Sequence, residues 1–140
     1  MIVIMRGRDV GDLSRPRDDR HDFWGVVLDA PDAPALAVFY ADLLGWELHV
    51  NPERTFATLA PPDGVAYLGV QYSEGFQPPL WPNVEGRQQM MLHLDFEVSD
   101  LPAAVDHAVE IGARLAAYQP QENVRVLLDP VGHPFCLYRG

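Results

Sequence analysis

The sequence contains the same structural plan twice. An Asp-x-Pro signal occurs at Asp32 and Pro34 and again at Asp100 and Pro102, each time just after an apolar run. An aspartate side chain caps the free N–H groups at a helix start, and proline is tolerated in the first turn because its missing N–H would be unpaired there. We therefore predict two helices that begin at equivalent points of two similar halves.

Each signal is followed by an apolar helical face and then by a glycine, Gly45 in the first half and Gly112 in the second. Glycine commonly ends a helix because it adopts the left-handed backbone conformation without strain. The apolar positions recur at helical spacing. They are Leu36, Phe39, Tyr40, Leu43 and Leu44 in the first half and Leu101, Ala104, Val105, Ala108 and Val109 in the second.

Short β-type runs surround both helices. They cover residues 23–29, 46–50, 55–60 and 66–72 in the first half and 91–98, 113–118, 124–128 and 134–139 in the second. Each half therefore reads strand, helix, strand, strand, strand, which predicts the α+β class with two β-α-β-β-β modules in one chain. The predicted boundaries are an irregular N-terminal extension over 1–22 and a single domain over 23–140, with module 1 at about 23–73, a connector at about 74–89 and module 2 at about 90–140.

The charge of the chain excludes some partners. The formal net charge is −10, and all the basic residues are arginine. Such a surface repels phosphate backbones and anionic lipid, so we expect neither nucleic acid nor membrane as a partner. The single cysteine, Cys136, and a start without a long apolar run fit a cytoplasmic protein. Phosphate-binding loops and nucleophile elbows are absent from the sequence.

The run 91–98 alternates strictly between apolar and ionisable residues. Leu92, Leu94, Phe96 and Val98 share one side, and His93, Asp95 and Glu97 share the other. In a strand, the first set would pack under the helices and the second would face outward. A row of one histidine and two carboxylates is compatible with metal ligands, with acid–base catalysts or with a solvated surface.

Several segments resemble the vicinal oxygen chelate superfamily, which includes glyoxalases, bleomycin-resistance proteins and extradiol dioxygenases. They are "FYADLLGW", "HLDFEVSDLPAAV", "IGARL" and "DPVGHPFCLYRG". The connector "PPLWP" followed by "QQMMLHLD" resembles a glyoxalase-like subgroup whose members mostly lack an assigned substrate. The resemblance implies curled mixed sheets with helices on the convex side. It also implies a concave cleft in which the first and last strands of each module supply ligands to a divalent metal.

Counting from the helix caps and the turn glycines places those ligand positions at His93 and Gly25 in the first strands and at Cys136 and Leu68 in the last strands. Glycine and leucine offer no donor atom, and two ligands are too few for a catalytic metal. Gln71 would face the cleft only if the first module contained a bulge or a turn of different length. The alternative metal set is then His93, Gln71 and Cys136.

We interpret the chain as a glyoxalase- or bleomycin-resistance-like protein that binds a small organic molecule in its cleft, without a catalytic metal. The expected ligand-binding residues are His93, Asp95, Glu97, Val27, Asp29, Tyr72, Trp81, Cys136 and Tyr138, with Leu68 and Val70 as further apolar wall. The alternative is a lyase, isomerase or dioxygenase that uses a divalent metal (Zn, Fe, Mn, Ni or Co), with Asp95 or Glu97 as the catalytic base. The resemblance also implies a homodimer.

Overall fold

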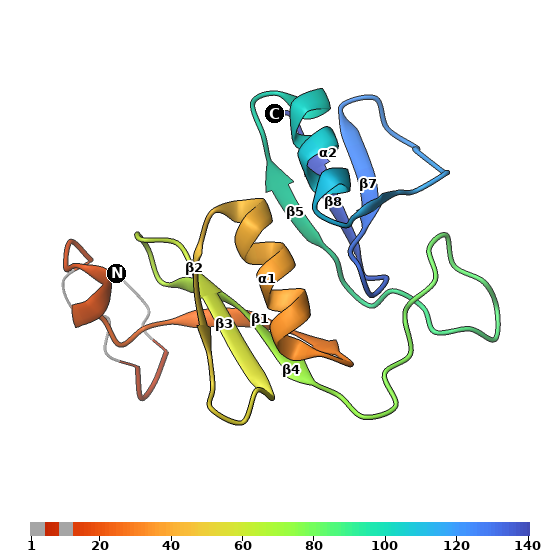
Figure 1. Cartoon of the computed structure of the whole chain (residues 1–140). Helices are drawn as coiled ribbons and strands as arrows, with labels where there is room; N and C mark the ends of the chain where they lie inside the picture. Colours follow the sequence, from red (N-terminus) through yellow and green to blue (C-terminus); the bar gives the residue numbers. More distant parts are fainter. Residues whose placement is uncertain (1–4, 9–12) are drawn as a thin grey trace.

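The computed structural model describes residues 5–8 and 13–140. Its elements are the 3₁₀-helix η1 (Arg17–Asp19), the helices α1 (Ala33–Leu44) and α2 (Leu101–Glu110), and the strands β1 (Trp24–Ala30), β2 (Glu47–Val50), β3 (Phe56–Ala60), β4 (Ala66–Tyr72), β5 (Leu94–Glu97), β6 (Arg114–Leu115), β7 (Val124–Leu128) and β8 (Pro134–Tyr138). The strands form two four-stranded sheets, ordered β1-β4-β3-β2 and β5-β8-β7-β6. The predicted α+β class with two modules of one plan is confirmed (Figure 1).

Both helices begin as the sequence predicts. The Asp32 carboxylate accepts a hydrogen bond of 3.1 Å from the Ala35 N–H, and Asp100 accepts one of 3.1 Å from the Ala103 N–H. Helix α1 ends at Gly45, whose φ of 70° lies in the left-handed region. These caps fix the ends of both helices relative to the strands that precede them.

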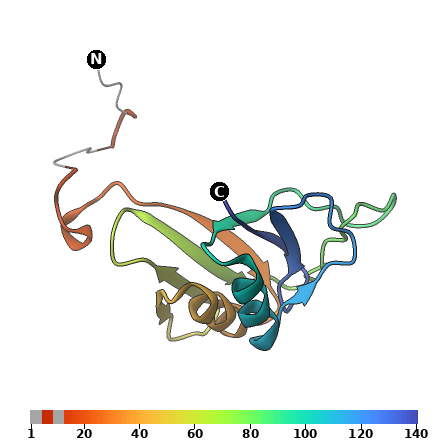
Figure 2. The ribbon, with the colours of Figure 1, turned by 90° about the horizontal axis from the view of Figure 1, so that it is seen from above.

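The two sheets share one topology. In each sheet the first strand runs parallel to the last strand of its module, β1 beside β4 and β5 beside β8, and the other pairs are antiparallel. Both helices lie on the same side of the two sheets (Figure 2). The opposite, concave side of each sheet is therefore left for binding.

Aromatic side chains join the modules into one core. Tyr40 of α1 lies with its ring centroid 6.5 Å from that of Phe96 on β5 and 6.0 Å from that of Phe135 on β8, and Phe39 lies 6.0 Å from Phe135. Tyr40 and Phe135 are fully buried. Because α1 packs on both sheets, it holds the concave sides of the two modules in a fixed relation.

Two expectations about exposure and strand length were wrong. Strand β5 begins at Leu94 rather than near Met91, and Leu92 is exposed instead of packing under the helices. The register pairs Leu94 with Phe135, so a residue before Leu94 would face Pro134, which has no N–H for the ladder. Trp24, at the start of β1, is also exposed.

The N-terminal segment contacts module 1. Arg17 donates a hydrogen bond of 2.8 Å to the Gly64 carbonyl, and its guanidinium lies 4.7 Å from the centroid of the Phe23 ring. Arg20 forms an ion pair with Asp22. Residues 1–4 and 9–12 of the predicted extension lie outside the described part of the chain. Neither helix in that part is long and apolar enough to cross a membrane.

Candidate functional site

A cavity of about 600 Å³ lies where the two modules and the connector meet. Strands β1 and β4 contribute Val27, Asp29 and Gln71, the connector contributes Phe76, and the chain entering β5 contributes residues 90–93. The turn before β8 contributes His133. The cavity therefore needs both modules, and the packing of α1 on both sheets keeps its walls together.

Gln71 belongs to the concave side of module 1. Its side-chain amide donates a hydrogen bond of 2.7 Å to the Asp29 carboxylate, its neighbour in the β1–β4 register. Gly69 lies five positions after Gly64 in the first module, whereas Cys136 lies four positions after Gly132 in the second. This extra residue in the turn is the condition under which the sequence allowed Gln71 to face inward.

The same shift corrects the expected position of Leu68. Val27 pairs with Gly69, as Asp95 pairs with Cys136, so Gly69 is the counterpart of Cys136. Leu68 and Val70 point to the helix side and are buried in the core, so neither forms a cleft wall. The counterparts of His93 and Cys136 in module 1 are therefore Gly25 and Gly69, neither of which has a donor side chain.

Neither glycine has free space for a side chain. A Cβ atom at Gly25 would lie 2.5 Å from the Tyr67 ring, and one at Gly69 would lie 3.1 Å from a Val27 methyl group. Packing of neighbouring side chains has therefore taken the room in which donor side chains would stand in module 1.

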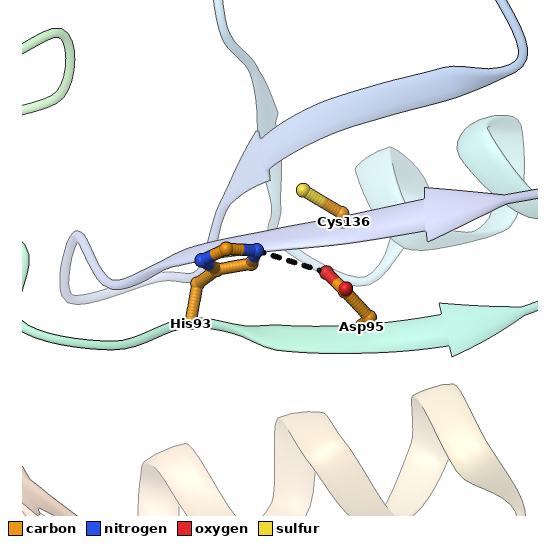
Figure 3. Close-up of side chains that lie close together, drawn as sticks. All are labelled: His93, Asp95 and Cys136. Carbon is orange, nitrogen blue, oxygen red and sulfur yellow. Dashed lines mark ion pairs between the residues drawn. The ribbon is translucent and has the colours of Figure 1, made fainter.

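Module 2 brings three donor residues together. The His93 Nε2 atom lies 3.0 Å from an Asp95 carboxylate oxygen, and the donor atoms of His93, Asp95 and Cys136 all lie within 4.8 Å of one another. Figure 3 shows the three side chains on one face of β5 and β8, the face opposite the helix α1. Burial, followed by the charge and hydrogen bond of Asp95, raises the pKa of the Cys136 thiol to about 11. Without a bound cation, Cys136 is therefore a poor nucleophile.

The other predicted residues are spread over the molecule. Glu97 and Tyr138 are paired neighbours on β5 and β8. Tyr72 pairs with buried Ala30 on the helix side of its sheet, and the Trp81 ring lies 5.6 Å from the Tyr118 ring. Neither Tyr72 nor Trp81 is among the residues that line the cavity. Of the predicted set, Val27, Asp29 and His93 line it, and Asp95 and Cys136 stand beside His93.

A buried network next to the cavity escaped the sequence reasoning. The fully buried carboxylate of Asp129 accepts a hydrogen bond of 2.7 Å from the Tyr40 hydroxyl and lies 2.8 Å from His133 Nδ1. Burial and the negative charge of Asp129 raise the pKa of Tyr40 well above its ordinary value. The sequence signal was the Asp129–His133 turn, but its partner Tyr40 is 89 residues away from Asp129.

Comparison with known proteins shows the family of this chain. The sequence profile of the glyoxalase-like domain matches residues 25–138. The chain belongs to this glyoxalase-like family, within the vicinal oxygen chelate superfamily. No protein of curated function matches the sequence.

Solved structures share the fold at low identity. A glyoxalase/bleomycin resistance protein/dioxygenase family enzyme from Burkholderia phytofirmans PsJN is 20% identical with a TM-score of 0.60, over 92% of this chain and 98% of that one. A possible glyoxalase from Bacillus cereus is 15% identical with a TM-score of 0.61, over 83% and 96%. The fosfomycin resistance protein FosX from Mesorhizobium loti is 10% identical with a TM-score of 0.56, over 87% and 92%.

The superfamily resemblance implies a divalent metal. Whether this chain has suitable ligands can be judged from the chemistry of His93, Asp95 and Cys136. Catalytic zinc takes three protein ligands and keeps one open position, and imidazole, carboxylate and thiolate are all zinc ligands. His93, Asp95 and Cys136 supply these three chemistries from module 2 alone. The residues present therefore fit a divalent metal, and the set of His93, Gln71 and Cys136 stays a prediction.

Proposed function

We propose that this protein binds a small, partly apolar organic molecule, neutral or cationic, in the cavity between its modules, and that this binding needs no metal. The cavity itself carries the proposal. Its volume of about 600 Å³ falls within the range of about 300–1,000 Å³ that small-molecule sites occupy.

The chemistry of the walls supports this ligand class. Val27, Phe76 and the methionines at 90 and 91 supply apolar surface, which gives affinity. Asp29 is the single carboxylate among the described lining residues, and no arginine is among them. A positive group or a strong hydrogen-bond donor is therefore favoured near Asp29, and an anion is disfavoured in a chain of net charge −10.

The experiment compares benzamidinium with benzamide and benzoate in chelator-treated protein, using isothermal titration calorimetry. Benzamidinium should bind most tightly and benzoate least. The Asp29→Asn variant should weaken benzamidinium about two- to fivefold, as expected for an exposed charge pair, and leave benzamide unchanged. The matched control is Asp106→Asn on the exposed side of α2. Equal binding of the three compounds, or equal effects of the two variants, would contradict the proposed specificity.

The cluster of His93, Asp95 and Cys136 favours a second candidate function, that of a metal-dependent lyase, isomerase or dioxygenase. A divalent metal held by these three residues would polarise a substrate oxygen. With Asp95 as a ligand, Glu97 is the remaining candidate for the catalytic base. It lies two residues after Asp95 on the same face of β5.

Titration with Co²⁺ tests this candidate, because a cobalt–thiolate bond gives a near-ultraviolet absorption band. Cys136→Ala should remove the band, and His93→Ala should weaken cobalt binding. Gln71→Ala should leave both unchanged, since this donor set does not include Gln71, whose amide donates a hydrogen bond to Asp29. Saturation without a thiolate band, or loss of binding in Gln71→Ala, would rule against this donor set.

A further inference from the structure

His133 stands between a buried carboxylate and the cavity. Its ring nitrogen Nδ1 lies 2.8 Å from Asp129 Oδ2, and its ring centroid lies 5.3 Å from that of Phe76. The side chain is 16% exposed, whereas the Asp129 side chain is fully buried. Two independent contacts therefore hold the imidazole in one orientation at the cavity wall.

The surroundings of Asp129 fix which nitrogen carries the hydrogen. One carboxylate oxygen accepts the backbone N–H groups of Val131, Gly132 and His133 at 2.9–3.0 Å. The other oxygen accepts the Tyr40 hydroxyl at 2.7 Å. An ionised carboxylate accepts hydrogen bonds and donates none, so Nδ1 is the donor to Asp129. In the neutral ring, Nε2 then has a free lone pair.

The second ring nitrogen of His133, Nε2, is exposed to solvent. Among the described residues no hydrogen bond to His133 Nε2 occurs, and no buried side-chain nitrogen or oxygen lacks a partner. Nε2 is therefore accessible to solvent, and His133 lines the cavity next to Tyr40. His133 therefore presents Nε2 as a hydrogen-bond acceptor for a ligand, because Asp129 accepts the hydrogen of Nδ1 and so fixes the tautomer of the ring.

We infer that His133 is a specificity-determining residue that accepts a hydrogen bond at Nε2 from a hydroxyl or N–H group of the bound molecule. This inference rests on the proposed binding function and narrows it. The ligand then combines an apolar body with a neutral donor toward His133. Tyr40 and Asp129 act as positioning residues, because they orient the imidazole.

The first test needs no ligand. Nitrogen-15 NMR of the imidazole groups at pH 8 should show His133 with hydrogen on Nδ1 and a bare Nε2, with the signal assigned by its loss in His133→Gln. Exposed His107 is the matched control, and its signals should average over both tautomers. A His133 ring with hydrogen on Nε2, or one that averages like His107, would overturn the inference.

The second test uses phenol and anisole, which differ in that anisole lacks the O–H donor. Phenol should bind about two- to tenfold more tightly, the range expected for one net hydrogen bond, and should shift the Nε2 resonance. His133→Phe should abolish this preference, and His107→Gln should keep it. Equal binding of the two probes to the native protein overturns the acceptor role but leaves the binding function standing. No binding of either probe overturns both.

Discussion

The two modules of this protein have the same architecture but different concave sides. Each begins with a strand, caps its helix with an aspartate and pairs its first strand in parallel with its last. In module 1 the equivalent inward positions are Gly25 and Gly69, while in module 2 they are His93 and Cys136. Among the described residues, the cluster of His93, Asp95 and Cys136 that could bind a metal ion therefore lies on module 2.

This difference separates what the fold requires from what the site requires. The helix caps and the apolar strand faces recur in both halves because each half must bury its own helix. The inward positions carry no such demand, so they differ in chemistry. Asp29 and Gln71 give module 1 a hydrogen-bonding role, and the His93 cluster gives module 2 a donor-rich role.

The strongest prediction concerns the polar link between the modules. Asp129→Ala should lower the free energy of unfolding by about 3–5 kcal/mol, because the buried Tyr40 hydroxyl and the part-buried backbone N–H groups of Val131 and His133 lose their acceptor. Urea denaturation measures the loss. Asp106→Ala, on the exposed side of α2, should change stability by less than about 0.5 kcal/mol. A loss of similar size in the two variants would show that the link is not structural.

The second prediction sharpens the description of the donor-rich module. With the Cys136 pKa raised from 9.0 to about 11, alkylation by iodoacetamide at pH 8 should be about 100-fold slower than for an unfolded thiol. Asp95→Asn should speed the reaction only in part, since burial is the larger cause. The folded protein holds the thiol proton more tightly than the unfolded chain does, so the protonated thiol contributes to the free energy of unfolding. This contribution is complete below pH 9 and is lost as the pH rises toward 11. Alkylation as fast as in the unfolded chain would disprove this environment.

The third prediction tests why module 1 has a glycine where module 2 has His93. Gly25→Ala should cost about 1–2 kcal/mol, because the new methyl group meets the Tyr67 ring and the ring has to turn away. Adding Tyr67→Ala should remove most of that extra cost in a double-mutant cycle. Additive effects of the two substitutions, measured by thermal unfolding, would mean that the ring does not restrict this position.

The smallest prediction tests the likeness of the modules. Asp32→Ala and Asp100→Ala should each cost about 1 kcal/mol, since each removes one N-cap hydrogen bond of 3.1 Å. Replacement by asparagine should restore most of the loss in both. If one cap costs nothing and the other a great deal, as measured by chemical denaturation, then the two helix starts are not equivalent.

The sequence predicted the fold well because its signals are local. Asp32, Asp100 and Gly45 act within one turn of their own helices, and the apolar periodicity marks the buried faces. Because the two halves repeat one pattern, these local signals also predicted the order of strands and helix in each module. The predicted strand at 91–98 was too long at its start. The first residue of β5 is set by Pro134, which belongs to another strand and lies far away in the sequence.

The site was predicted less well because it depends on register and on distant contacts. One extra turn residue moved Leu68 into the core and brought Gln71 inward, and counting alone could not choose between these outcomes. The alternation of 91–98 placed His93 and Asp95 on one side, and the repeat pointed to Cys136, but Asp95 was predicted as a base and not as a ligand beside Cys136. The contact between Tyr40 and Asp129 left no local pattern in the sequence.

The most direct measurement is an amide NMR titration of chelator-treated protein with benzamidinium. The account holds that an organic molecule binds between the modules without a metal, so chemical shifts should change at Val27, Asp29 and Gln71 of module 1 and also at His93 and His133 of module 2. Changes confined to one module, or changes that appear only after zinc is added, would contradict it.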